Sequence, residues 1–64
     1  MNDKDLVEHL LIETEARYDS DLFAFFKEYG NARELKEFGE GMRRRMKERE
    51  LRREVLIEKY ENSR

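Results

Sequence analysis

The 64-residue sequence contains no cysteine, no proline and no tryptophan, and it has only three glycines. Without cysteine there is no disulfide framework and no thiolate chemistry, which excludes a small secreted disulfide-rich protein. The longest apolar run, residues 22–26, is far too short to cross a membrane. The first residues are acidic where a secretory signal peptide would be basic, so we expect a cytoplasmic protein with no membrane association.

What the sequence does contain favours helix. Glu, Lys, Arg and Leu are abundant, and no stretch alternates between apolar and polar residues for long enough to form a strand. Residues in the first half recur in steps of three and four, which places them on one face of a helix. This apolar stripe consists of Val7, Leu11, Thr14, Tyr18, Leu22, Phe25 and Tyr29. The expected fold class is therefore all-α, with the stripe as the main packing face of the first helix.

Capping residues place the ends of two helices. Asn2 or Asp3 can cap the first helix, because a short polar side chain can accept a hydrogen bond from a free backbone N–H group of the first turn. Gly30 suits the left-handed position that often follows a helix. Asn31 together with Glu34 forms a capping box for a second helix.

These signals predict one small domain over residues 1–64, folded as an antiparallel helical hairpin. Its arms span about 4–29 and 32–61, with a turn at 30–31. The polar residues at 19–21 leave open whether the first arm is one helix or is broken there. Net charge supports the fold-back: residues 1–30 carry eight acids and three bases, a net −5, whereas residues 31–64 carry eight acids and eleven bases, a net +3.

Gly39 and Gly41 interrupt the second arm, and each glycine costs a helix interior about 1 kcal/mol relative to alanine. In a hairpin that turns at residue 30, Gly39 lies across from Leu22 and Phe23. We therefore expect the glycines to make room for large side chains of the first arm, with a kink in the second arm as the alternative.

Five of the seven aromatic residues fall within residues 18–29. They point in several directions around a helix, so the seam of a two-helix hairpin covers only some of them. An uncovered Phe forfeits about 1.5–3 kcal/mol of burial, and a chain this small has little stability to lose. We therefore predict a self-association or partner interface at Tyr18, Leu22, Phe23, Phe25, Phe26 and Tyr29. We expect these residues to pack against a second copy of the chain in a homodimeric helical bundle of coiled-coil type. Binding in the groove of another protein is the alternative.

Four arginines share one face of the second arm, at i, i+4, i+7 and i+8 spacing: Arg45, Arg49, Arg52 and Arg53. Such a cluster needs negative charge nearby. In the fold-back register the first arm offers Glu8, Glu13, Glu15 and Asp19. The alternative is an acidic partner or a nucleic-acid backbone. The interleaved Glu48, Glu50 and Glu54 and the acidic isoelectric point of about 5.5 weigh against nucleic acid.

No catalytic or cofactor motif is present. Asp5, His9 and Glu13 share a helix face, but a structural zinc site needs four ligands, usually with thiolates or further histidines. Ordinary solvated side chains making weak pairs are the simpler interpretation. Ser20 and Ser63 show no relation to His9 that a nucleophilic triad would need.

The sequence thus predicts a non-enzymatic, regulatory interaction module without cofactor or metal, which forms a homodimer and binds a protein partner. In architecture alone it resembles small dimeric regulators of bacteria, plasmids and phages. A small dimeric nucleic-acid-binding regulator that uses the arginine face is the alternative.

Overall fold

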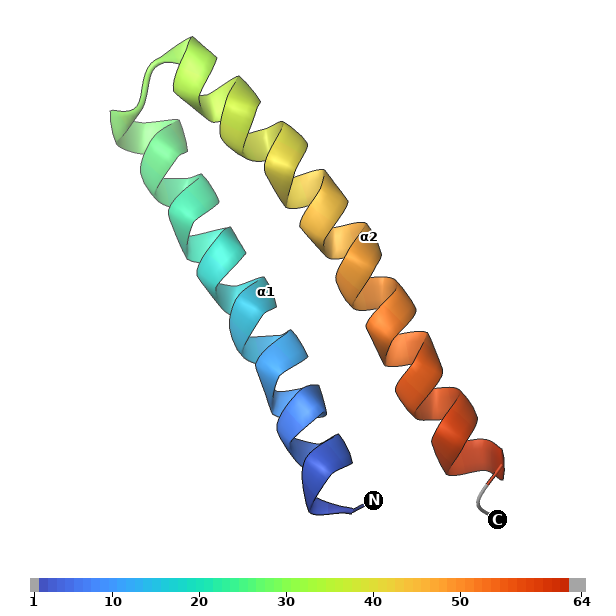
Figure 1. The fold of residues 1–64 in the computed structure, drawn as a ribbon. Coiled ribbons are helices and arrows are strands. Elements are labelled where there is room, and N and C mark those ends of the chain that lie inside the picture. The colour runs from blue at the N-terminus through green and yellow to red at the C-terminus, as the bar shows by residue number, and fades with distance from the viewer. Residues whose placement is uncertain (1, 63–64) are drawn as a thin grey trace.

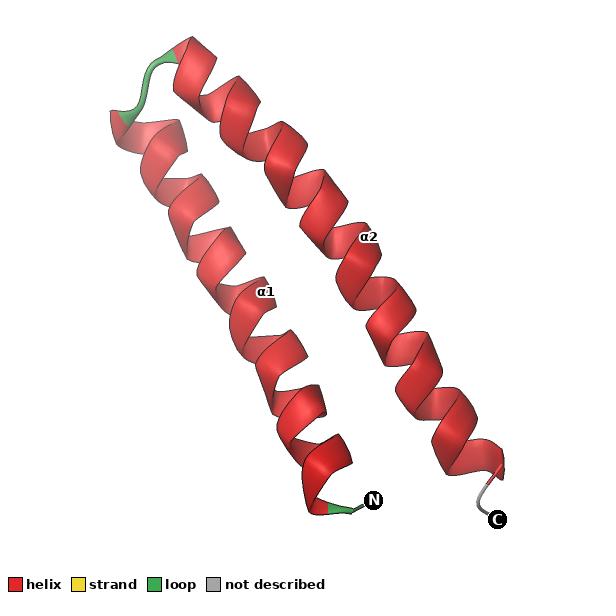
Figure 2. Cartoon of the chain, viewed as in Figure 1, coloured by secondary structure: helices red, strands yellow, loops and turns green. Residues whose placement is uncertain are grey.

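Two long helices run antiparallel, side by side, with both ends of the chain at the same end of the molecule (Figure 1). The computed structural model describes residues 2–62. Helix α1 spans Asp3–Tyr29 and helix α2 spans Ala32–Asn62, and only a short connection separates them. Within residues 2–62 there is no strand (Figure 2). The expected all-α helical hairpin is confirmed.

Asparagine side chains cap the start of both helices. Asn2 Oδ1 accepts a hydrogen bond from the backbone N–H of Asp5 at 2.8 Å, and Asn31 Oδ1 accepts one from the N–H of Glu34 at the same distance. Each cap satisfies one of the backbone donors that a helix leaves free in its first turn. Because Asn31 caps α2 almost directly after α1 ends, the chain reverses in very few residues.

Gly30 does not adopt the left-handed conformation that the sequence suggested. Its φ and ψ are −87° and 164°, which is an extended conformation. The Gly30 N–H donates to the carbonyl of Phe26 at 2.8 Å and so completes the last turn of α1. The chain then enters the Asn31 cap directly, and this path needs no positive φ.

Both arms are continuous helices. α1 passes through residues 19–21 without a break, which settles the question that the polar residues there had left open. α2 likewise passes through Gly39 and Gly41. The explanation proposed for Gly39 is wrong, because a Cβ added there would meet no heavy atom within 4 Å.

The seam between the helices buries few apolar side chains. Among residues 2–62, only Ile12 and Leu56 are buried apolar residues, with exposed fractions of 0% and 7%. Near the turn, the rings of Phe26 and Phe38 contact each other across the seam with their centroids 5.1 Å apart. Most of the remaining seam is occupied by charged side chains.

The apolar stripe lies largely outside this seam. Its exposed members include Val7, Leu11, Tyr18, Phe25 and Tyr29, and Phe25 is 54% exposed. The expectation that the stripe packs against the second arm is therefore wrong. The seam instead follows a second set of positions in α1, about a quarter turn away: Asp5, Glu8, Ile12, Glu15, Asp19, Leu22 and Phe26.

Candidate interaction surfaces

A buried ion cluster lies at the middle of the seam. Arg49 Nη1 contacts Asp19 Oδ2 at 2.7 Å, and both residues are about 5% exposed. The Nε of Arg45 donates to the other oxygen of the same carboxylate at 2.9 Å. Removing one member of such a cluster leaves an uncompensated charge in a low-dielectric environment. The two helices are therefore held in register by charge at this level.

Gly41 makes room for this cluster. It is buried, and a Cβ at this position would lie 2.9 Å from an Nη atom of Arg45. The Arg45 guanidinium also lies over the ring of Phe38, 5.1 Å from its centroid. Gly41 thus accommodates a large side chain as expected, but that side chain belongs to its own helix and not to the first arm.

Arg52 bridges two glutamates of α1. Its Nε donates to Glu8 at 2.6 Å and its Nη1 donates to Glu15 at 2.9 Å. The hydrogen bond from Arg52 lowers the pKa of Glu15 below its usual value, and the two carboxylates raise the pKa of Arg52 above its usual value. Arg52 and Glu15 therefore remain ionised at neutral pH.

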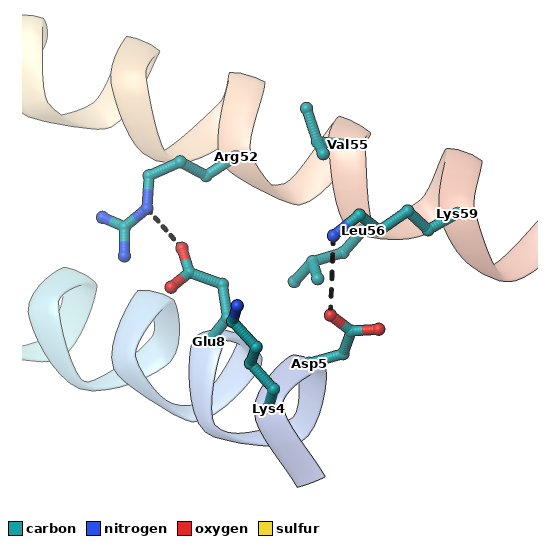
Figure 3. Close-up of a pocket in the computed structure, with 7 residues that line it drawn as sticks. All are labelled: Lys4, Asp5, Glu8, Arg52, Val55, Leu56 and Lys59. Atoms are coloured by element: carbon teal, nitrogen blue, oxygen red, sulfur yellow. Dashed lines mark hydrogen bonds and ion pairs between the residues drawn. The ribbon is translucent and has the colours of Figure 1, made fainter. Parts of the chain in front are cut away.

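Two further ion pairs lie on the side of the Asp19–Arg49 pair that is away from the turn. Arg53 Nη2 donates to Glu13 at 2.8 Å, and Lys59 Nζ lies 3.8 Å from Asp5. Figure 3 shows the Lys59–Asp5 and Arg52–Glu8 pairs near Leu56. These residues line a hollow of about 300 Å³. Within residues 2–62, no three acidic or histidine side chains come together as metal ligands would.

All four arginines of the predicted face thus contact acids of α1. The four acids are the ones that the fold-back register offers: Glu8, Glu13, Glu15 and Asp19. The intramolecular explanation of the arginine cluster is what the structure shows. A role of the same face toward nucleic acid or an acidic partner stays a prediction.

The predicted aromatic interface is divided among three directions. Phe26 and Leu22 lie toward the seam, where Leu22 shares a hollow with Tyr18 and Phe38. Tyr18, Phe25 and Tyr29 are exposed on the flank that carries the apolar stripe. The Phe25 ring contacts those of Phe26 and Tyr29 at centroid distances of 5.8 and 5.2 Å. Phe23 lies on the opposite flank and lines another hollow.

That hollow was not predicted from the sequence. It has a volume of about 530 Å³ and is lined by Phe23, Leu35, Lys36, Gly39, Glu40, Met42, Arg43 and Met46. Gly39, Met42 and Met46 follow one another at helical spacing, so a face with a missing side chain flanked by flexible ones was visible in the sequence. Gly39 therefore opens a space that no side chain of the hairpin fills.

Comparison of the chain with models of protein families, with curated proteins and with solved structures found no match. Neither α1 nor α2 combines the length and hydropathy that a membrane-spanning helix requires.

Proposed function

We propose that this chain is a non-enzymatic helical interaction module that self-associates and binds a protein partner. The observation that carries the proposal is the inverted distribution of side chains. Twelve large apolar residues are exposed among residues 2–62, whereas two are buried and the seam holds mainly ion pairs. Exposed apolar area on this scale is typical of interaction surfaces in soluble proteins.

The two flanks of the hairpin have different roles in this proposal. The flank with the apolar stripe is long and continuous, which suits pairing with a second copy. The opposite flank offers the hollow at Gly39, with Phe23, Met42 and Met46 around it. Methionine side chains adapt to irregular surfaces, so this hollow is the proposed place for a large apolar side chain of a different protein.

Nucleic-acid binding through the four arginines is the less favoured function. Each arginine already contacts a carboxylate of α1. A phosphate backbone would have to compete with these carboxylates, and Asp19 and Arg49 are nearly inaccessible. A salt-sensitive shift of duplex DNA or structured RNA by the protein would reverse this ranking.

We expect sedimentation equilibrium at tens of micromolar to give twice the chain mass of 7.9 kDa. Phe25→Glu should shift the equilibrium toward monomer, because it places a charge on the exposed stripe. Lys27→Glu, a charge change two residues away and outside the stripe, is the matched control and should leave the dimer in place. A well-folded wild-type monomer at these concentrations would refute self-association.

A further inference from the structure

The apolar stripe of α1 has a symmetric spacing, and most of its members are exposed in the hairpin. Counted from Tyr18, its other members lie four, seven and eleven residues away in both directions. The pairs are Thr14 and Leu22, Leu11 and Phe25, and Val7 and Tyr29. The spacing of the stripe therefore reads the same from either end.

We propose that two copies of the chain pair through this stripe, with α1 antiparallel to α1 of the second copy and a twofold axis at Tyr18. The inference rests on the self-association proposed above and specifies its geometry. In a twofold interface the same surface is used by both copies, so residue i contacts j and j contacts i. An antiparallel pair centred on Tyr18 brings Val7 opposite Tyr29 and Leu11 opposite Phe25 of the second copy, whereas Leu22, at the level of Thr14, lies toward the seam of its own hairpin.

Side-chain size favours the antiparallel over the parallel arrangement. The half of the stripe before Tyr18 has no aromatic ring, with Val7, Leu11 and Thr14, whereas the half after it carries two rings, Phe25 and Tyr29. Antiparallel pairing places each of these two rings opposite an aliphatic residue, Leu11 or Val7, so the helix axes are held at a similar distance on both sides of the twofold axis. Parallel pairing would join aromatic to aromatic at one end and small to small at the other, and the helices would splay.

The register of the hairpin extends the argument to α2. From the Asp19–Arg45 contact to the Phe26–Phe38 contact, the chain moves seven residues forward in α1 and seven residues back in α2. By the same register, Met46 lies level with Tyr18. An axis at that level places Arg44 and Glu48, two residues to either side of Met46, opposite Glu48 and Arg44 of the second copy. Opposite charges thus meet beside the stripe, close to the level of Tyr18.

Packing the stripe against α2 of the second copy is less favourable. On this flank the exposed positions of α2 mix Leu51 and Val55 with the glutamates Glu37, Glu48 and Glu58, and these carboxylates would be desolvated against aromatic rings. The size of the surface is sufficient. The Cα atoms extend over 49 × 17 Å, so the broad face offers on the order of 800 Å², which is what each partner of a stable complex typically buries.

Disulfide cross-linking tests this geometry, since the chain has no cysteine of its own. Tyr18→Cys places one thiol of each copy at the axis, within the short Cα separation that a disulfide requires. Under mild oxidation this variant should shift from 7.9 kDa to twice that mass. Leu11→Cys and Phe25→Cys should each remain monomeric on a denaturing gel when oxidised alone, and should cross-link when they are mixed. Ser20→Cys, an exposed position on the other side of α1, is the control and should not cross-link.

The alternatives give distinct results. Leu11→Cys and Phe25→Cys each cross-linking to themselves would establish parallel pairing and overturn the proposal. A dimer by sedimentation that cross-links at Ser20→Cys, or at none of the stripe positions, would overturn it as well while leaving self-association standing. A wild-type monomer by sedimentation would instead refute the proposed function itself. The mixture of Leu11→Cys and Phe25→Cys keeps the test decisive if Tyr18→Cys fails to fold.

Discussion

Asp19→Asn should unfold the hairpin or bring it close to unfolding at room temperature. The substitution preserves the size of the side chain but removes the charge that faces Arg49, whose side chain is 6% exposed, and Arg45. Breaking a buried ion pair from one side costs about 3–5 kcal/mol. A chain of this length has about that much stability in total. Circular dichroism melts of the wild type and the variant measure the loss.

Two companion variants make this experiment specific. Asp21→Asn removes the same charge two residues away at an exposed position, and we expect a change of no more than about 0.5 kcal/mol. Asp19→Leu combined with Arg49→Met replaces the buried pair with apolar side chains, which is often neutral or stabilising. The combination should therefore recover much of the stability that Asp19→Asn loses. Equal midpoints for Asp19→Asn and Asp21→Asn would show that the cluster does not hold the seam.

Ile12→Ala should be the second most damaging change. Ile12 is the one fully buried large side chain among residues 2–62, and truncating such a residue costs about 2–5 kcal/mol through lost burial and the cavity that remains. Leu10→Ala is the matched control, because Leu10 is 54% exposed and lies outside both the seam and the apolar stripe. Thermal melts of the two variants should differ by most of the expected cost. Similar losses would mean that Ile12 is not at the centre of the core.

The sequence predicted the hairpin well because local signals determine it. Asn2 and Asn31 are strong caps, and the two-residue interval between the helices follows from Gly30 and the Asn31 cap. Charge asymmetry and arginine spacing also identified the acids that meet the arginine face. Those pairs need only the fold-back register and long side chains, both of which the sequence provides.

The face of α1 that forms the seam could not be predicted in the same way. A helix with two candidate faces, one apolar through Phe25 and one acidic through Asp19, does not reveal by its own pattern which face turns inward. That choice depends on the opposing helix. There Arg45 and Arg49 pair with the carboxylate of Asp19, and Phe25 is left exposed to solvent within the hairpin. The hollow at Gly39 could not be predicted for a similar reason, because the spacing of Gly39, Met42 and Met46 shows a shared face but not whether a side chain of α1 fills the gap.

Charge fills the inside of the hairpin, and in the proposed dimer a second copy covers its apolar outside. The dependence of the thermal midpoint on protein concentration tests this arrangement most directly, because folding linked to dimerisation is stabilised by mass action. We expect the midpoint to rise steadily as the wild type is concentrated from the low to the high micromolar range, and to be insensitive to concentration in Phe25→Glu. A wild-type midpoint that does not change with concentration would contradict the account.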